Sequence, residues 1–227
     1  MRILRGRVLA MSYIEKNIIR ELVILLGLLG GALTYLWLAS EQSFFIRMIP
    51  PIVCLGIVFV RMRRYINFIN GGTAELDVHD ILDELPDEFE VIPDLNLTNR
   101  GNIDFVVVGP TGVWTLEVKS HRGRMGFDGT RLTRNGFRME RDFLKQAQAE
   151  MYAVKECVEQ ELGETVFVKP VVVFASPGAH MQFGLRPLRG VQVIGVSWLI
   201  QLLTKEIPYL LSRERIEQIS SILRSKE

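Results

Sequence analysis

The feature that most constrains the fold is a run of nineteen residues, 22–40, without a charged side chain. As an α-helix this run would rise about 28 Å, close to the thickness of the hydrocarbon core of a bilayer. A second apolar run, 44–60, is interrupted by Arg47 and by a Pro-Pro pair. It would either cross the membrane with Arg47 at the surface or re-enter on the same side. The sequence therefore predicts a two-helix membrane anchor over residues 22–60.

Basic residues set the orientation predicted for this anchor. Residues 1–70 carry nine Lys or Arg and three Asp or Glu, and eight of the nine basic residues flank the apolar runs outside their short connection. By the positive-inside rule, both ends of the hairpin face the cytoplasm, and the inner or plasma membrane is the expected location. The predicted organisation is a basic N-terminal segment (1–21), the anchor (22–60), a basic linker (61–70) and a cytoplasmic domain (71–227).

The pattern from residue 71 onward is that of an α/β domain. Its balance is acidic, with 18 Lys or Arg and 23 Asp or Glu, and Gly71-Gly72 marks the expected break before a helix at 73–85. The two cysteines have no partners at metal-ligand spacing, which argues against a disulfide framework and a zinc site. Strands are predicted at 88–92, 102–108, 113–119, 166–174 and 191–195, a second hairpin within 121–138, and helices at 140–162, 197–204 and 209–224.

The first hairpin can be placed in register from its turn. A loop centred on Pro110-Thr111 pairs positions whose numbers sum to 221, and Pro at the first central position favours a four-residue loop. In that register Asp104 lies opposite Glu117, on one face with Lys119. The other face would be buried and would carry Ile103, Phe105, Val107, Trp114, Leu116 and Val118. A three-residue loop would separate the two carboxylates, but the consistent apolar face argues against it.

The pair of carboxylates beside a lysine points to metal chemistry. Like charges opposite one another repel unless a cation lies between them, and two carboxylates with open coordination positions suit Mg²⁺. The simpler interpretation is a solvated sheet face, on which Glu117 and Lys119 are an incidental pair. Glu75 lies at the edge of an apolar helix stripe, where a carboxylate is not expected, and adds weight to this interpretation. Its simpler interpretation is an exposed glutamate favoured by the helix dipole.

These residues together resemble a known family. The stretches 71–75 (GGTAE), 101–113 (GNIDFVVVGPTGV) and 116–119 (LEVK) look like the nuclease-related domain, a family of the PD-(D/E)XK superfamily of restriction-endonuclease-like folds. The resemblance covers about 71–175. It implies a mixed sheet flanked by helices, and cleavage of phosphodiester bonds with Mg²⁺ or Mn²⁺.

The resemblance also implies a role for each matching residue. Asp104 and Glu117 would be metal ligands, Lys119 the catalytic lysine and Glu75 the acidic residue of the first helix. Gln146 matches a glutamine that the family places in the following helix, although the Asn-Pro of the family pattern is not present here. The superfamily also contains inactive members.

A basic segment follows the strand that carries Glu117 and Lys119. Residues 119–145 hold eight basic and three acidic side chains, which would suit a phosphate backbone of DNA or RNA. An ordinary solvated hairpin is the alternative. Phe127 and Phe137 would stack on bases in the first interpretation, but the favoured one packs them on the inner face of the hairpin. The candidate nucleic-acid-binding residues are Arg122, Arg124, Arg131, Arg134, Arg138, Arg141 and Lys145.

The leading hypothesis is a membrane-anchored, metal-dependent nuclease that faces the cytoplasm. The alternative is a catalytically inactive, membrane-tethered module that binds nucleic acid or serves as a scaffold. A weaker third interpretation makes the membrane hairpin the active part of an assembly with unknown protein partners. Residues 176–227 carry no assignable function, and Trp198, Leu199, Leu202 and Leu203 are expected to complete the core or cover a sheet edge.

Overall fold

The computed structural model describes residues 20, 23–24, 26–35, 44–98, 101–205 and 210–226. The chain divides into two compact units, Met1–Asn70 and Gly71–Glu227. Among the described residues, no helix is both long enough and apolar enough to cross a membrane. Residues 36–43, which include the end of the first predicted span and the turn of the predicted anchor, lie outside the described residues.

Helix α2 runs without interruption from Phe44 to Leu82. The helix predicted to begin at residue 73 is therefore the end of α2, and the predicted linker 61–70 is helical, although the boundary between the two compact units does fall between Asn70 and Gly71. Each glycine in a helix costs only about 1 kcal/mol relative to alanine, which packing of an apolar stripe outweighs. That stripe is present directly after the glycines, where Ala74, Val78 and Leu82 are buried.

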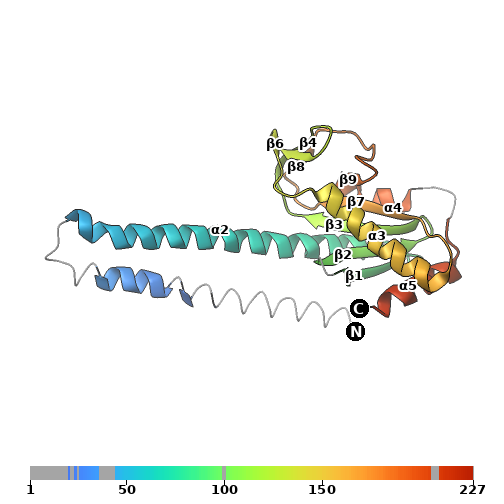
Figure 1. The fold of residues 1–227 in the computed structure, drawn as a ribbon, viewed down its shortest axis with the longest axis horizontal. Helices are drawn as coiled ribbons and strands as arrows, with labels where there is room; N and C mark the ends of the chain where they lie inside the picture. Colours follow the sequence, from blue (N-terminus) through green and yellow to red (C-terminus); the bar gives the residue numbers. More distant parts are fainter. Residues whose placement is uncertain are drawn as a thin grey trace. The chain divides into compact units, whose positions relative to one another are not determined.

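The second unit is built on a mixed five-stranded sheet in the order β1-β2-β3-β7-β9. The first three strands are antiparallel, and β3, β7 and β9 are parallel, so β3 joins the two kinds of pairing. Figure 1 shows the helices α3 and α5 lying along one face of this sheet. The strands are β1 (Glu90–Thr98), β2 (Gly101–Gly109), β3 (Gly112–Lys119), β7 (Val168–Phe174) and β9 (Gln192–Gly195).

Both faces of the sheet are covered by helices, which confirms the predicted α/β fold with a mixed sheet between helices. On one face, the end of α2 and the helix α4 (Leu199–Thr204, after the 3₁₀ turn η1 at Val196–Trp198) pack against Trp114, which is buried. On the other, α3 (Phe143–Leu162) and α5 (Arg213–Arg224) pack against the sheet. Leu199 and Leu203 complete the core, one of the two roles predicted for this segment, whereas Trp198 is 46% exposed and does not belong to the core.

The register predicted for the first hairpin is confirmed. The pairs run from Phe105↔Leu116 to Gly109↔Gly112, so the loop has two residues instead of the four that were favoured. Ile103 is the exception on the apolar face, because it packs with Val106 and Val108 in the cluster of the opposite face. The pairing of β1 with β2 becomes irregular just beyond the pair Leu95↔Ile103.

A second, four-stranded sheet lies beside the first in the order β6-β5-β4-β8 (Figure 1). It contains the second predicted hairpin, which turns at Asp128–Arg131. A third strand and the parallel partner β8 were not predicted, because both are only two or three residues long. The strands are β4 (Gly123–Phe127), β5 (Leu132–Arg134), β6 (Phe137–Arg138) and β8 (Ala179–Met181).

Candidate active site

Asp104 lies where the β2–β3 ladder ends. The last backbone pair is Phe105↔Leu116, one position before Asp104 would face Glu117. Instead, the backbone N–H of Val118 donates to Asp104 Oδ2 at 2.6 Å. The carboxylate thus takes the place of a strand partner, which holds Asp104 beside the backbone of Glu117 and Val118 and leaves Oδ1 for another partner.

Glu117 is the most deeply buried acidic residue of the site, with 2% of its surface exposed. Its Oε1 accepts hydrogen bonds from Lys119 and from Gln146, the latter at 2.6 Å. Its Oε2 is buried without a hydrogen-bond partner. Burial of this depth rules out the solvated sheet face as the explanation for Glu117. An ionised carboxylate in such a place requires compensation.

Lys119 is held by two contacts at the end of β3. Its ammonium forms an ion pair with Glu117 and lies 4.9 Å from the centre of the Phe143 ring, at the start of α3. The cation–π contact fixes the ammonium on the side of the sheet that faces α3. The ring of His121 also packs on Phe143, with the ring centres 5.3 Å apart. Phe143 and His121 are therefore neighbours of the site that the sequence did not single out.

Helix α3 brings two further polar residues to Glu117. Gln146 donates through Nε2 both to Glu117 and, at 2.9 Å, to Glu150 one turn later. Glu150 is only 7% exposed, and its Oε2 is buried without a hydrogen-bond partner. The sequence prediction missed Glu150. Glu150 could have been recognised from its position between Ala147 and Val154, inside the apolar stripe of the helix, where a carboxylate is unusual unless it has a function.

Glu75 lies on α2 at the rim of the site, with its side chain exposed. Loss of hydration raises the pKa of its carboxyl, and Asp94 and Glu117 raise it further, while Lys119 acts in the opposite sense. These interactions show that Glu75 is close enough to feel the other charges. The structure thus brings Glu75, Asp104, Glu117, Lys119 and Gln146 into one neighbourhood.

The electrostatics of the site favour a bound cation. Burial raises the pKa of Asp104 to about 7, and the Glu117 charge adds to the effect, against the Val118 N–H, which lowers it. Burial and the Glu117 charge likewise raise the pKa of Glu150 to about 9. The neighbouring carboxyl groups of Asp104, Glu117 and Glu150 cannot all be ionised in this buried site without a compensating positive charge. A divalent cation would supply that charge and lower these pKa values.

The donor set fits a hard divalent metal. Asp104 Oδ1 and the unpartnered Glu117 Oε2 are carboxylate oxygens, the ligands that Mg²⁺ prefers, and two protein ligands leave positions for water and phosphate. Among the described residues, three potential ligand atoms lie within 4.8 Å of one another at His79, Asp80 and Asp83. That group is at the end of α2, and both aspartates are exposed. The buried, unpartnered oxygen favours the Asp104–Glu117 pair.

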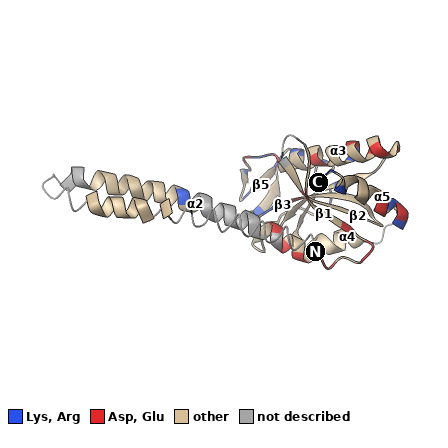
Figure 2. Ribbon diagram, turned by 90° about the horizontal axis from the view of Figure 1, so that it is seen from below, with Lys and Arg blue, Asp and Glu red and all other residues tan. Residues whose placement is uncertain are grey.

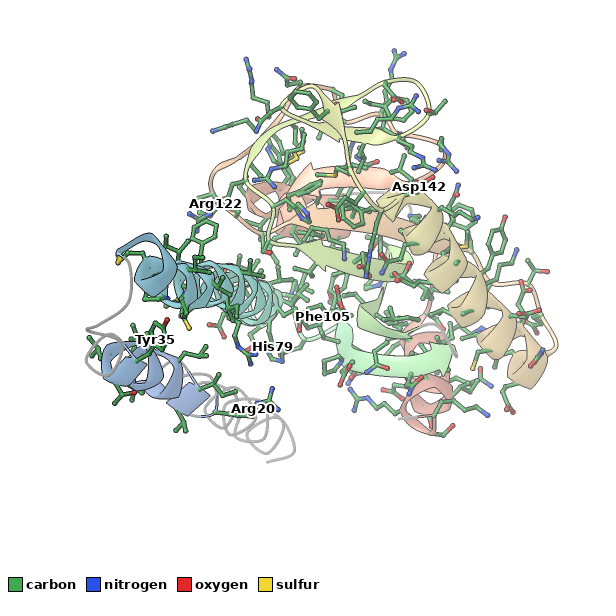
Figure 3. All side chains as sticks on the ribbon, turned by 60° about the vertical axis from the view of Figure 1, so that its left-hand side comes forward. Arg20, Tyr35, His79, Phe105, Arg122 and Asp142 are labelled. Atoms are coloured by element: carbon green, nitrogen blue, oxygen red, sulfur yellow. The ribbon has the colours of Figure 1, made fainter. Side chains whose placement is uncertain are left out.

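All seven basic residues predicted to bind nucleic acid are exposed. Figure 2 shows Lys and Arg in blue on the ribbon, including the region around β5. Two of the seven are engaged by acids: Arg138 pairs with Asp128 at 2.6 Å, and Arg131 lies 3.9 Å from Asp142. Figure 3 labels Arg122 on the segment that leaves the site and Asp142 at the start of α3. Within the described part of the chain, Arg122 forms no ion pair.

Gln146→Leu tests the arrangement around Glu117. The variant removes a donor shared by two buried carboxyls, so the free energy of unfolding should fall by about 1–3 kcal/mol. The affinity of the site for Mg²⁺ should fall about 10- to 100-fold, as for other residues that orient a metal ligand. Urea denaturation and calorimetric titration with Mg²⁺ measure the two effects. Gln160→Leu, at an exposed position of the same helix, is the control and should change both by little. Equal behaviour of the two variants would show that Gln146 does not position Glu117.

One family model matches this chain over the segment that carries the site. The family model described as the nuclease-related domain matches residues 70–175. Among solved structures, a repair endonuclease from Pyrococcus abyssi is similar over 47% of this chain and 45% of that chain, with 15% identity and a TM-score of 0.28. The chain thus spans less than half of that structure. No protein of curated function matches the chain.

Proposed function

We propose that this chain, whose residues 70–175 form a nuclease-related domain, is a metal-dependent nuclease that hydrolyses phosphodiester bonds in DNA or RNA. The observation that carries the proposal is the buried Glu117, which meets Asp104, Lys119 and Gln146 and keeps one unpartnered oxygen. A buried carboxylate costs stability unless something compensates its charge. The presence of Glu117 at a buried position therefore favours a functional role for its carboxylate.

Each residue then has a distinct part. Asp104 and Glu117 would hold Mg²⁺ or Mn²⁺, which, when bound, supplies a polarised water and stabilises charge on the phosphate. Lys119, fixed by Glu117 and the Phe143 ring, places a positive charge next to the reacting phosphate. Gln146 orients Glu117. Glu75, at the open rim, is available to accept a hydrogen bond from water.

Cleavage by the full chain is the direct test. We expect single- or double-stranded DNA or RNA to be cut with Mg²⁺ or Mn²⁺ and left intact with EDTA. Asp104→Asn should abolish cleavage, and Asp77→Asn, at an exposed position of α2, should leave it unchanged. Salt-sensitive binding without cleavage under every metal condition would overturn the nuclease and support the inactive binding module.

The basic segment predicts the salt dependence of binding. Arg122 and Arg124 are exposed and follow Lys119 directly. If both contact phosphates, replacing them with glutamine should reduce the slope of log K against log salt by about 1.8 for duplex DNA, or about 0.9 for each contact. Fluorescence anisotropy at several salt concentrations measures this slope. The control variant Arg213→Gln/Arg215→Gln, on α5, should keep the wild-type slope, and an unchanged slope in the first variant would remove Arg122 and Arg124 from the interface.

We further propose that residues 22–60 anchor the nuclease to the inner or plasma membrane, with the domain in the cytoplasm. The support is in the sequence: the charge-free run 22–40, the second apolar run and the basic flanks. The chain should remain in the membrane fraction after carbonate extraction. In right-side-out vesicles its α/β domain should resist added protease until the vesicles are opened. Release of the intact chain by carbonate would overturn the anchor, and digestion in sealed vesicles would overturn the orientation.

A further inference from the structure

An exposed phenylalanine occupies the tip of the β5–β6 hairpin. Phe137 has 78% of its surface exposed, which contradicts the expectation that it packs on the inner face. Phe127, in contrast, packs against the core of the second sheet as expected. Single exposed apolar residues are common, so exposure alone assigns no role. A role for Phe137 is indicated instead by the position of its ring and by the charged side chains around it.

The tip is a rigid turn. Arg134 pairs with Phe137 across the two-residue loop Asn135-Gly136, and both loop residues have positive φ, 52° and 85°. Asn-Gly with this backbone is the preferred two-residue hairpin turn. Phe137 is therefore held out on an ordered hairpin.

The tip is tied to the segment that leaves the active site. Asn135 N–H donates to the Arg124 carbonyl at 2.8 Å, and Asn135 Oδ1 accepts from the Arg124 N–H at 2.9 Å. Arg134 Nε donates to the Arg122 carbonyl at 2.7 Å. Gly123, with φ of 107°, permits this approach, since a Cβ there would lie 2.7 Å from Asn135 Oδ1.

This anchoring places the tip near Lys119. Arg122 is three residues beyond Lys119, so their Cα atoms are at most about 11 Å apart even in a fully extended chain. The segment is also fixed at both ends. The carbonyl of Lys119 accepts from Ala175, and the N–H of Gly123 donates to the carbonyl of Gly178. The tip thus lies within a few nucleotides' length of the predicted cleavage site.

The charges around the ring are suited to a phosphate backbone. Arg124 and Arg134 are exposed, and neither forms an ion pair with the described residues. Arg138, next to Phe137, is instead held by Asp128 at 2.6 Å. An aromatic ring flanked by unneutralised guanidinium groups is the combination with which proteins bind unpaired nucleotides.

We propose that Phe137 is a stacking platform for an unpaired base of the nucleic acid, with Arg124 and Arg134 on the adjoining phosphates. The inference rests on the proposed function only for the nature of the ligand. It specifies the substrate class: single strands, or ends and distortions with an unstacked base, bind in preference to continuous duplex. DNA and RNA both offer such a base.

Phe137→Trp gives a direct readout in the full chain, with EDTA present so that no strand is cut. A single-stranded oligonucleotide should quench the fluorescence of this variant beyond that of the wild-type chain, which contains three tryptophans. The matched control is Phe167→Trp. Phe167 is also exposed (70%) and near a lysine, but it precedes β7 at the end of the sheet opposite Lys119. Its fluorescence should not respond.

Phe137→Ala measures the effect on affinity. The Kd for the single strand should rise about fivefold or more, the equivalent of about 1 kcal/mol or more for one stacked base. The Kd for the matching duplex should change less than twofold, and Phe167→Ala should change neither. Absence of quenching in Phe137→Trp, or an unchanged Kd in Phe137→Ala, would overturn the proposal.

The two proposals fail separately. Quenching and selective binding without cleavage in any metal would overturn the nuclease and leave the stacking platform. Metal-dependent cleavage with no response at position 137 would overturn the platform alone.

Discussion

Glu117→Gln is expected to abolish metal-dependent cleavage without lowering the stability of the metal-free chain. The loss should be at least about 10³-fold, because a metal ligand supports several kcal/mol of charge stabilisation and each 1.4 kcal/mol is a factor of ten. Glutamine keeps the shape of the side chain and one oxygen to accept from Gln146. It removes the charge that repels Asp104 and Glu150. Lys119, 17% exposed, can rehydrate when its partner is neutral.

Two measurements on one preparation separate these effects. Cleavage kinetics in Mg²⁺ give the activity, and thermal unfolding in EDTA gives the Tm, which should equal or exceed that of the wild-type chain. Glu156→Gln, an acidic position on the exposed side of α3, is the control and should retain activity. A fall in Tm of many degrees would mean that Glu117 serves mainly to hold Lys119 and Gln146 in the fold. Full activity would remove Glu117 as a metal ligand.

The part of this site on the β2–β3 hairpin could be predicted from the sequence. Its register follows from Pro110-Thr111 and from alternating apolar residues, since a slip by one position would turn every side chain to the other face. That register places Glu117 and Lys119 together at one end of β3, as the structure does. The exact partner of Asp104 was not predictable, because there the carboxylate replaces a backbone pair and takes the N–H of Val118.

The rest of the site depends on contacts between segments far apart in the chain. Glu150 meets Glu117 only because α3 packs on β3, and no local pattern gives that pairing. The same limit applies to α2: the Gly71-Gly72 pair predicts a helix that begins at residue 73, but buried contacts of the residues that follow let α2 continue through the two glycines. For Phe137 the sequence predicts a packed side chain, but the side chain is exposed. Its exposure depends on a strand of only two residues, which periodicity cannot detect.

The stability of the metal-free chain should fall as the pH rises from about 5 to 8. Asp104 has an ordinary pKa of 3.8, and in the folded chain it is raised to about 7, so the folded state favours the protonated carboxyl. That contribution is complete below pH 4 and is lost as the pH rises through 7. Glu150, raised from 4.5 to about 9, acts in the same direction at higher pH. The two losses add, so the free energy of unfolding should be lower at pH 8 than at pH 5.

Urea denaturation in EDTA across this pH range measures the slope, and Mg²⁺ should oppose it. The metal binds ionised carboxylates, so the stabilisation it gives should be small at pH 5 and grow towards pH 8. Asp104→Asn should flatten the slope and abolish most of the response to Mg²⁺, and the exposed control Asp77→Asn should change neither. Stability that rises with pH in EDTA would contradict the repulsion inferred among Asp104, Glu117 and Glu150. If the proposal holds, the pH at which Mg²⁺ begins to stabilise the chain should also be the pH at which cleavage begins, because both require Asp104 to lose its proton.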